Sequence, residues 1–533
     1  MESLERIRTE LISGDAFLGI ELGSTRIKAS LIDRGHRPIA SGSFAWENRL
    51  ENGVWTYRLE DAIAGVQSCY ADLLSNVLHD YGVMPKTFRA IGISGMMHGY
   101  LPLDRAGRQL APFRTWRNTM TGEAAEELTE LFGQNIPQRW SIAHLYHSIL
   151  QEEEHVCQIA SLTTLAGYVH RLLTGENVLG IDEASGMFPI DAESKRFHSG
   201  MLEAFDALVR DRKYPWKLAE ILPRVAVAGE PAGKLTPEGA RLLDPTGTLE
   251  TGVPFCPPEG DAGTGMVATD SVLPRTGNVS VGTSVFGMIV LEQKLKRLYR
   301  EIDIVTTPSG DPVAMVHCNN GTSDVDAWIN LIRDCMRAYG LEPDERTLYQ
   351  KLFRSALEGE ADCGGLVGCN YLSGEHTTNF TSGRPLFARL PDARFSSPNF
   401  MRAQLFGVFA SLRLGMDILT EGESVAIDNL NGHGGFFRVE GVGQRIMAAA
   451  LHAPVTVMET AGNGGPWGMA ILAAYMVQKG ENESLSDYLA KRVFAESKRS
   501  TYKPNPKETK GFEEYLLRYR TLLKAERAAL EIE

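Results

Sequence analysis

Two short stretches decide the fold of this chain: Glu259-Gly-Asp-Ala-Gly-Thr-Gly265 and, after a brief spacer, Gly277-Asn-Val-Ser-Val-Gly-Thr-Ser284. The first carries a carboxylate, Asp261, in a segment whose small residues favour a tight turn over a helix interior. The second predicts a short strand that ends at Gly282, Thr283 and Ser284, where backbone N–H groups and two hydroxyls suit phosphate oxygens. A carboxylate that can deprotonate a hydroxyl, followed by a phosphate-binding turn, suits phosphoryl transfer. Taken singly, each stretch is as readily an ordinary turn.

A similar element lies near the N-terminus. Residues 17–33 read as two strands joined by a hairpin. The bend consists of Gly23, Ser24 and Thr25. Glu21 and Lys28 straddle it, where a carboxylate could organise hydrated Mg²⁺ and a lysine could balance phosphate charge. The alternative is that Lys28 is simply an exposed strand residue.

A third glycine-rich turn follows strand-like residues late in the chain, within residues 427–437. It contains Gly434 and Gly435 and precedes a helix-compatible stretch over residues 443–452. Glycines at such a place let a flat nucleotide approach the backbone, and Phe436 could pack beside a purine or ribose. An ordinary strand-to-helix loop would contain the same residues.

Three such turns in this order resemble the actin-like ATPase fold and, within it, the FGGY carbohydrate kinase family. The resemblance extends nearly from end to end, with weaker matches at residues 173–176, 374–377 and 461–474. The residues from Glu21 to Thr25, with Lys28, are similar to the family's first phosphate motif, and Gly282-Thr-Ser284 to its second. Gly434-Gly435 is similar to the adenosine motif, and Asp261 to the catalytic base.

The resemblance implies an α/β fold made of two ribonuclease H-like domains around an interdomain cleft. We expect residues 1–260 to form the sugar-binding domain and residues 261–533 the nucleotide-binding domain. It also implies ATP and Mg²⁺ as cofactors, with the Mg²⁺ held by Glu21 and Asp261, directly or through water.

The implied acceptor is a hydroxyl of a xylulose- or ribulose-like ketose, or of a related polyol. Met97, His98 and Gly99 resemble the triplet that xylulokinases place against the ketose. An imidazole there can hydrogen-bond a sugar hydroxyl, and a glycine lets the main chain approach the ligand. Trp116 and Asn118 align with a further sugar-binding segment of those enzymes.

Several residues depart from the family pattern. Glu21 stands where most relatives carry Asp, so the metal must sit differently or the chain must relax. Asn118 replaces an Asp that grips sugar hydroxyls, and an amide both donates and accepts where a carboxylate only accepts. Together with Arg114 and Arg117, this change could favour a different ketose, a polyol or an acidic sugar. Phe406 also stands where relatives usually show Glu.

Two rival functions remain on the same fold. One is a chaperone-like or filament-forming ATPase, for which the chain lacks an appended peptide-binding domain. The other is a catalytically weak sugar-binding regulator, which the Glu21 and Asn118 departures make conceivable. ATP consumption with and without sugars separates the kinase from both rivals.

Composition narrows the partners and the compartment. A chain of 533 residues exceeds one typical core, and its net charge of −13 argues against an extended nucleic-acid surface. Seven cysteines without Cys-x-x-Cys spacing predict neither a disulfide framework nor a zinc site. The charged N-terminus lacks an apolar signal core, and no segment approaches the ~18 apolar residues of a membrane span. We expect a cytoplasmic protein with a small-molecule sugar as its partner, no nucleic acid and no membrane, and leave a homodimer open.

Hydrophobic periodicity predicts the other elements. We expect helices over residues 59–81, 120–132, 325–338, 399–420 and 515–530, and strands at residues 279–291 and 313–317.

Overall fold

The computed structural model describes residues 2–532, which fall into two compact units. Unit 1 comprises Met1–Val272, Leu298–Val313 and Asn463–Glu496. Unit 2 comprises Leu273–Arg297, Ala314–Gly462 and Ser497–Glu533. The compact units are thus discontinuous in sequence, which the expected division at residue 260 did not anticipate. That division stays a prediction about functional domains.

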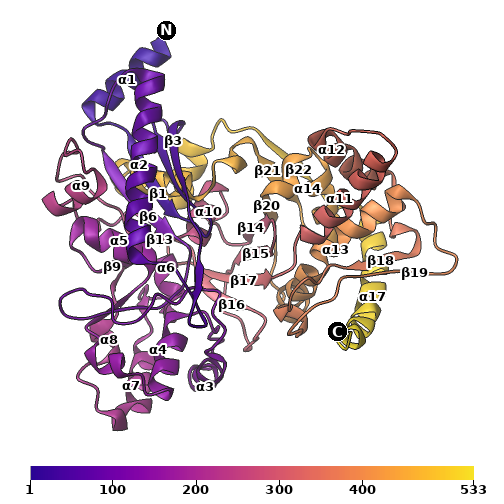
Figure 1. The fold of residues 1–533 in the computed structure, drawn as a ribbon, viewed down its shortest axis with the longest axis horizontal. Helices are drawn as coiled ribbons and strands as arrows, with labels where there is room; N and C mark the ends of the chain where they lie inside the picture. The colour runs from indigo at the N-terminus through magenta and orange to yellow at the C-terminus, as the bar shows by residue number, and fades with distance from the viewer. Residues whose placement is uncertain (1, 533) are drawn as a thin grey trace. The chain divides into compact units, whose positions relative to one another are not determined.

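The central sheet of unit 1 has the strand order β13-β6-β1-β2-β3 (Figure 1). Its strands are β1 (Phe17–Leu22), β2 (Arg26–Ile32), β3 (Pro38–Ala45), β6 (Ala90–Gly95) and β13 (Glu259–Gly260). β1 and β2 form the antiparallel hairpin predicted for residues 17–33, and Glu21 pairs directly with Lys28. β6 runs parallel to both β1 and β13. The strands β1 and β6 are buried along their whole length, which is typical of a sheet covered on both faces.

Helices cover both faces of this sheet. α2 (Leu59–Tyr81) packs on β3, and α15 (Gly464–Gln478) packs on β1 and β6. Glycines permit both approaches, because a Cβ on Gly42 would overlap the backbone of α2 and one on Gly19 the backbone of α15. Gly19 pairs with Ser30 and Gly42 with its neighbour Ala29, so the two glycines face opposite sides of the sheet.

The remaining elements of unit 1 surround this core. The helices are α1 (Glu2–Ser13), α3 (Gly122–Phe132), α4 (Ser141–Leu150), α5 (Leu165–Thr174), α6 (Ile181–Ser185), α7 (Ser199–Leu208), α8 (Leu218–Ile221), α9 (Pro237–Leu243), α10 (Asp261–Ala268) and α16 (Leu485–Tyr488). The short strands are β4 (Arg49–Glu51), β5 (Val54–Thr56), β7 (Leu101–Leu103), β8 (Ser161–Thr163), β9 (Val178–Gly180), β10 (Ile190–Asp191), β11 (Arg196–Phe197), β12 (Arg224–Ala226) and β16 (Asp303–Thr306).

Unit 2 repeats the strand order of unit 1. Its sheet runs β17-β15-β14-β20-β21-β22, with an antiparallel hairpin of β14 and β15 and parallel pairs β14–β20 and β20–β21. Its strands are β14 (Thr276–Val281), β15 (Val285–Val290), β17 (Pro312–Cys318), β20 (Asn429–His433), β21 (Val455–Met458) and β22 (Arg499–Tyr502). β14, β15, β20 and β21 therefore occupy the places that β1, β2, β6 and β13 hold in unit 1. The shared order is evidence for duplication, although the two halves have little sequence similarity.

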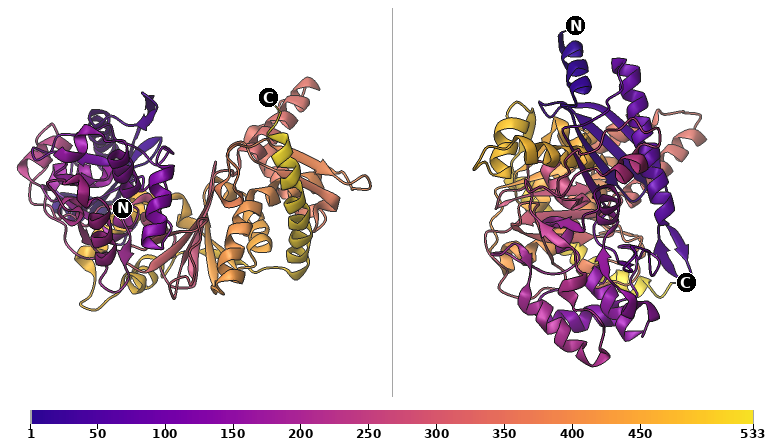
Figure 2. Two further views of the ribbon diagram at one scale, coloured as in Figure 1. Left: turned by 90° about the horizontal axis from the view of Figure 1, so that it is seen from below. Right: turned by 90° about the vertical axis from the view of Figure 1, so that its left-hand side faces the viewer.

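The helices of unit 2 pack around α13, which is almost entirely buried. They are α11 (Ser323–Ala338), α12 (Glu345–Ser355), α13 (Ser397–Asp417), α14 (Val442–Leu451) and α17 (Pro506–Ala529), beside the strand pair β18 (Leu366–Cys369) and β19 (Leu386–Arg389). The C-terminal helix α17, yellow in Figure 2, runs beside α13 and α14. It begins nine residues before the predicted start at residue 515, because Asn505 caps the N–H groups of Lys507 and Glu508.

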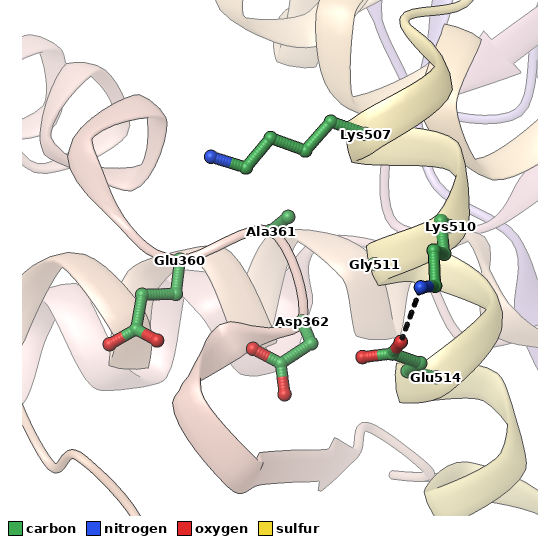
Figure 3. Close-up of a pocket in the computed structure, with 7 residues that line it drawn as sticks. All are labelled: Glu360, Ala361, Asp362, Lys507, Lys510, Gly511 and Glu514. Atoms are coloured by element: carbon green, nitrogen blue, oxygen red, sulfur yellow. Dashed lines mark ion pairs between the residues drawn. The ribbon is translucent and has the colours of Figure 1, made fainter.

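A surface hollow of about 270 Å³ lies beside α17 and is lined by Glu360, Ala361, Asp362, Lys507, Lys510, Gly511 and Glu514 (Figure 3). Its charges are partly paired, since Lys510 lies 4.0 Å from Glu514. None of the site residues predicted from the sequence lines it. Within residues 2–532, no helix combines the length and the apolar character that crossing a bilayer requires.

Candidate active site

The three parallel strands of unit 1 end at one edge of the sheet. Leu22 of β1 pairs with Gly95 of β6, and Gly95 pairs with Gly260 of β13. Ligand sites in open α/β sheets form outside the carboxyl ends of such strands. The turn at residues 23–25, the loop at residues 96–99 and Asp261 therefore leave the sheet side by side, although they are widely separated in sequence.

Asp261 is the first residue of helix α10, not part of a simple turn as its glycine-rich surroundings predicted. The reason is tertiary packing. α15 lies so close that a Cβ on Gly468 would overlap the backbone of Thr264, and such close contact offsets the low helix propensity of glycine. The prediction of a helix-free segment was therefore wrong, but the carboxylate still stands at the exposed start of the element.

The charge state of Asp261 suits a base. Its Oδ1 accepts a hydrogen bond of 3.3 Å from the backbone N–H of Met97. The side chain is accessible to solvent, yet the protein crowded around it desolvates the carboxylate and raises its pKa to about 6. Hydrogen bonds from the N–H groups of Met97 and Ala262 act in the opposite direction. A carboxylate with this pKa is ionised at neutral pH and remains basic enough to accept a proton.

A second carboxylate, Glu21, lies beside Asp261. Only 7% of its surface is exposed, and burial together with the Asp261 charge raises its pKa to about 7, against the opposing charge of Lys28. Its Oε2 lies against Gly465, in the first turn of α15, in the space that a side chain would fill. The longer Glu side chain is thus accommodated by a glycine.

These two carboxylates fit a Mg²⁺ ion. Within the described residues, no cluster of three or more His, Cys, Asp and Glu side chains has the arrangement of a metal site. Mg²⁺ commonly takes only one or two carboxylates and completes its shell with water and phosphate oxygens. A cation here would also relieve the repulsion between Glu21 and Asp261.

The turn at residues 23–25, predicted as the first phosphate site, has its carbonyl groups directed into the protein. Gly23 O accepts from Trp46 Nε1 at 2.7 Å, Ser24 O from the Tyr57 hydroxyl at 2.6 Å, and Thr25 O from the Trp46 N–H at 3.2 Å. Carbonyl oxygens on the outer surface would repel a phosphate. Because these three point inward, the outer surface of the turn suits an anion. Sequence reasoning did not identify Trp46 and Tyr57, because residues that hold a turn from behind have no motif of their own.

The turn at residues 282–284 of unit 2, predicted as the second phosphate site, is built in the same way. The carbonyls of Gly282 and Thr283 each accept a hydrogen bond of 2.8 Å, from the N–H groups of Thr322 and Gly321 respectively. A Cβ on Gly282 would meet nothing within 4 Å, so the outer side of this turn is open. Thr283 is exposed beside it.

The third turn lies next to the second, because β14 and β20 are parallel neighbours. Gly434 has φ +102° and lies too close to Val281 O to carry a side chain, whereas the space before Gly435 is open. Phe436 differs from the prediction. It is 1% exposed and packs against Phe353 and Phe409 at ring distances of 5.5 and 5.2 Å. It supports the turn from the core and offers no face to a nucleotide.

The triplet predicted to face the sugar, Met97-His98-Gly99, is closely packed. His98 is buried with φ +73°, and its Nδ1 lies 3.1 Å from Gly186 O, so this nitrogen carries the proton. Gly99, with φ +110°, packs against the Phe113 ring, where a Cβ would come within 2.6 Å. Its missing side chain therefore makes room for Phe113, not for a ligand as the sequence suggested. Met97 is buried and donates its N–H to Asp261.

Asn118 also differs from its predicted role. Its side chain accepts from the N–H of Trp55 at 2.9 Å and donates to the carbonyls of Trp55 and Thr115 at 2.8 and 3.0 Å. It is 3% exposed. The amide thus fastens β5 to its own loop, a task that requires a donor and an acceptor together.

The two nearby arginines differ in whether their charge is already paired. Arg114 is buried and bound to Ser148 and Glu153, so its charge is already compensated within the protein. Arg117 is exposed and stacks on Trp55, 4.1 Å from the ring centre. Trp116 is 38% exposed, and its predicted contact with the sugar stays a prediction.

Comparisons with known proteins agree with this architecture. The pattern of the FGGY family of carbohydrate kinases matches residues 16–267 with its N-terminal domain and residues 277–477 with its C-terminal domain. A xylulose kinase from Lactococcus lactis is 23% identical over 510 residues, which cover 93% of this chain and 94% of that protein.

Solved structures share the fold. A ligand-bound xylulose kinase from Lactobacillus acidophilus has a TM-score of 0.78 at 19% identity, and a gluconate kinase from the same organism has 0.77 at 19%. Each alignment covers 96% of this chain and 98% of the other. The predicted actin-like fold of two domains is confirmed. The chain belongs to the FGGY family of carbohydrate kinases and is an ATP-dependent kinase that acts on a small-molecule sugar.

Proposed function

We propose that the chain transfers the γ-phosphate of ATP to a primary hydroxyl of a ketopentose such as xylulose or ribulose, or of a related polyol. The observation that carries the proposal is the placement of Asp261, with a pKa of about 6, at the same sheet edge as the turn at residues 23–25. The likeness of Met97, His98 and Gly99 to the xylulokinase triplet and the full-length similarity to a xylulose kinase support the choice of sugar.

The proposed reaction is a direct displacement. The Asp261 carboxylate accepts the proton of the sugar hydroxyl while the hydroxyl oxygen forms a bond to the γ-phosphorus. The bond from that phosphorus to the β–γ bridging oxygen breaks, and ADP leaves with the electron pair. Ser24, Thr25 and Lys28 would hold the transferring group, and Gly282, Thr283 and Ser284 the nucleotide phosphates. Positioning of this kind supplies most of the rate in phosphoryl transfer.

The proposed reaction requires Mg²⁺. Glu21 and Asp261 would hold the ion, directly or through water, and the bound ion would neutralise charge on the phosphate oxygens. Burial of Glu21 beside a second carboxylate is then explained, because bound Mg²⁺ would compensate its negative charge. Gly434 and Gly435 would admit the adenosine, with Phe436 behind them as structural support.

The proposed compartment is the cytoplasm, where ATP is supplied and where the chain's seven free thiols would remain reduced. A homodimer is one candidate oligomeric state. Light scattering of the purified protein measures its mass and so distinguishes a monomer from a dimer.

ADP release measured with and without sugars tests the proposal. The panel contains ketopentoses, ketohexoses, polyols and sugar acids at equal concentration with Mg²⁺ and ATP. We expect release that depends on a sugar and is fastest with a ketopentose. Release that does not depend on any sugar would support the ATPase, and sugar binding without release would support the regulator. A preference for sugar acids would overturn the choice of acceptor but leave the role of Asp261 intact.

A further inference from the structure

Two buried carboxylates, Glu259 and Asp182, accept hydrogen bonds from the starts of helices α6 and α10 respectively. Glu259 Oε2 accepts hydrogen bonds from the N–H groups of Asp182 and Glu183 at 3.1 and 3.3 Å, in the first turn of α6. Asp182 Oδ2 in turn accepts from the N–H groups of Gly260 and Gly263, both at 3.1 Å. The second pair of bonds closes the start of α10, whose first residue is Asp261.

The two carboxyl groups, of Asp182 and Glu259, lie in close contact with glycines of the facing segments. A Cβ on Gly263 would overlap the Asp182 carboxyl group, one on Gly260 would lie 2.8 Å from Asp182 Oδ2, and one on Gly180 would overlap the Glu259 carboxyl. The missing side chains of these three glycines therefore leave room for the two carboxyl groups. Asp182 and Glu259 are 0% and 1% exposed, so water does not substitute for either acid.

Helix α10 has no cap of its own. Its N-cap residue is Gly260, which has no side chain to accept the first N–H groups. Asp182 supplies the missing acceptor from another element, and Glu259 fixes the helix that carries Asp182. The Asp261 carboxylate accepts from the N–H groups of Met97, at 3.3 Å, and of Ala262, which lies in the same turn, so its position depends on the backbone turn that Asp182 fastens.

We propose that Asp182 is a positioning residue for phosphoryl transfer, holding the first turn of α10 so that the Asp261 carboxylate stays in reach of the acceptor hydroxyl, and that Glu259 holds Asp182 in place. This inference rests on the proposed role of Asp261. A catalytic group displaced by about 1 Å loses on the order of 10²-fold in rate, so a loosened turn is felt in the chemical step.

The test compares two substitutions of one residue. Asp182→Asn keeps a side-chain oxygen that accepts both N–H groups, whereas Asp182→Ala removes the acceptor. We expect Asp182→Ala to lower kcat with the best sugar of the panel by about 10²-fold and to leave KM for ATP unchanged. We expect Asp182→Asn to restore most of the lost kcat.

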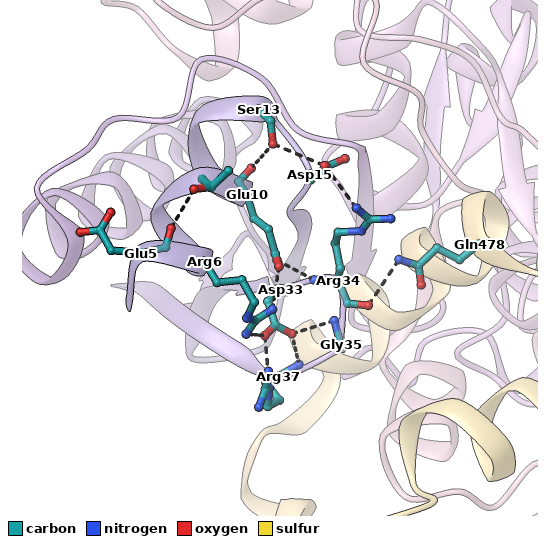
Figure 4. A network of polar contacts seen from close by, with 11 residues as sticks. Glu5, Arg6, Glu10, Ser13, Asp15, Asp33, Arg34, Gly35, Arg37 and Gln478 are labelled. Carbon is teal, nitrogen blue, oxygen red and sulfur yellow. Dashed lines mark hydrogen bonds and ion pairs between the residues drawn. The ribbon is translucent and has the colours of Figure 1, made fainter. Parts of the chain in front are cut away.

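A matched control comes from a second buried aspartate of unit 1. Asp33 is 0% exposed and its Oδ1 accepts from the N–H groups of Gly35 and Arg37, with Arg6 bound to its Oδ2 (Figure 4). It follows the end of β2 that is opposite to the turn at residues 23–25. Asp33→Ala should lower the thermal unfolding temperature while kcat, measured below that temperature, stays at the wild-type value.

Hydrogen exchange of the amides in residues 259–266, measured without substrates, reads the cap independently of activity. Faster exchange in Asp182→Ala but not in Asp182→Asn is expected. Unchanged exchange, or faster exchange with wild-type kcat, would overturn the positioning role, as would an Asp182→Asn variant as slow as Asp182→Ala. If the exchange results hold while Asp261→Asn still turns over sugar, the proposed function fails and the cap remains.

Discussion

Glu21 Oε2 occupies the space that a side chain on Gly465 would require. The two residues lie on β1 and α15, far apart in sequence and in direct contact in unit 1. The family pattern described above has the shorter Asp at this place. The extra methylene of Glu21 lies against a glycine in the helix that faces it. The departure in the first phosphate motif is thus compensated locally.

The Gly465→Ala substitution should displace the Glu21 carboxylate. Because the displaced atom is the end of a flexible side chain, we expect little loss of stability but a fall in kcat of about 10-fold to 10²-fold. The double variant Glu21→Asp/Gly465→Ala should recover most of the activity, since the shorter acid vacates the space. Steady-state kinetics of both variants decide this, and wild-type kcat in Gly465→Ala alone would refute the match.

The acid limb of the pH–rate profile should reflect Asp261. A base must be ionised to accept a proton, so activity is present above its pKa and is lost as the pH falls through it. With the Asp261 pKa raised to about 6, we expect kcat/KM to decline near pH 6 and not near the ordinary aspartate value. A profile that stays flat down to pH 5, where about nine-tenths of such a group would be protonated, would contradict the assignment.

The substitution Asn118→Asp should destabilise the protein. A carboxylate cannot donate to the carbonyls of Trp55 and Thr115, and it would leave them facing a negative charge, so we expect a loss of about 1–3 kcal/mol in the free energy of unfolding. Chemical denaturation measures this. The control is Asn48→Asp, whose Oδ1 accepts from Arg117 and continues to do so as a carboxylate. Equal stability of Asn118→Asp and wild type would show that Asn118 is not a structural clamp.

The Glu183→Gln substitution should stabilise the protein increasingly as the pH rises. Glu183 on α6 is 0% exposed, and burial raises its pKa well above the usual value, although Thr164 acts in the opposite direction. The folded state therefore keeps a proton that the unfolded state releases above about pH 4.3, so the stability from this group is full below that pH and declines as the pH rises toward the folded pKa. Gln removes this dependence.

Calorimetric unfolding of both proteins at pH 5.5 and pH 8 checks the sign. The unfolding temperature of Glu183→Gln should exceed that of the wild type by more at pH 8. The same substitution at the exposed Glu47 serves as the control. A difference that shrinks with rising pH would mean that Glu183 is ionised in the fold.

The sequence predicted most of the fold because the signals were local. α2 spans residues 59–81 as its periodicity indicated, and α11 and α13 begin two residues before their predicted starts. The hairpin at residues 17–33 and the strand character predicted for residues 279–291 follow from apolar runs beside glycine-containing bends. These features depend on neighbours in the chain.

The predictions that were wrong concern residues whose environment is set by contacts between distant segments. Helix α10 forms because α15 packs on it. The side chain of Asn118 is hydrogen-bonded to Trp55, which lies 63 positions away, and is therefore not available to a ligand. Phe436 is drawn into an aromatic core that includes Phe353 and Phe409. The mutual caps of Asp182 and Glu259 were not visible either, since no spacing rule links residues 77 positions apart. Residue types gave the chemistry of these positions, but only the packing decides which groups remain available to a ligand.

The role of Asp261 as the base is measured by sugar-dependent ADP release from the Asp261→Asn variant. The variant keeps the size of the side chain and removes the proton acceptor. We expect release with the best sugar to fall to the level measured without sugar, while calorimetric titration with the Mg²⁺-loaded nucleotide gives nearly the wild-type affinity. Wild-type release by this variant would show that Asp261 is not the base.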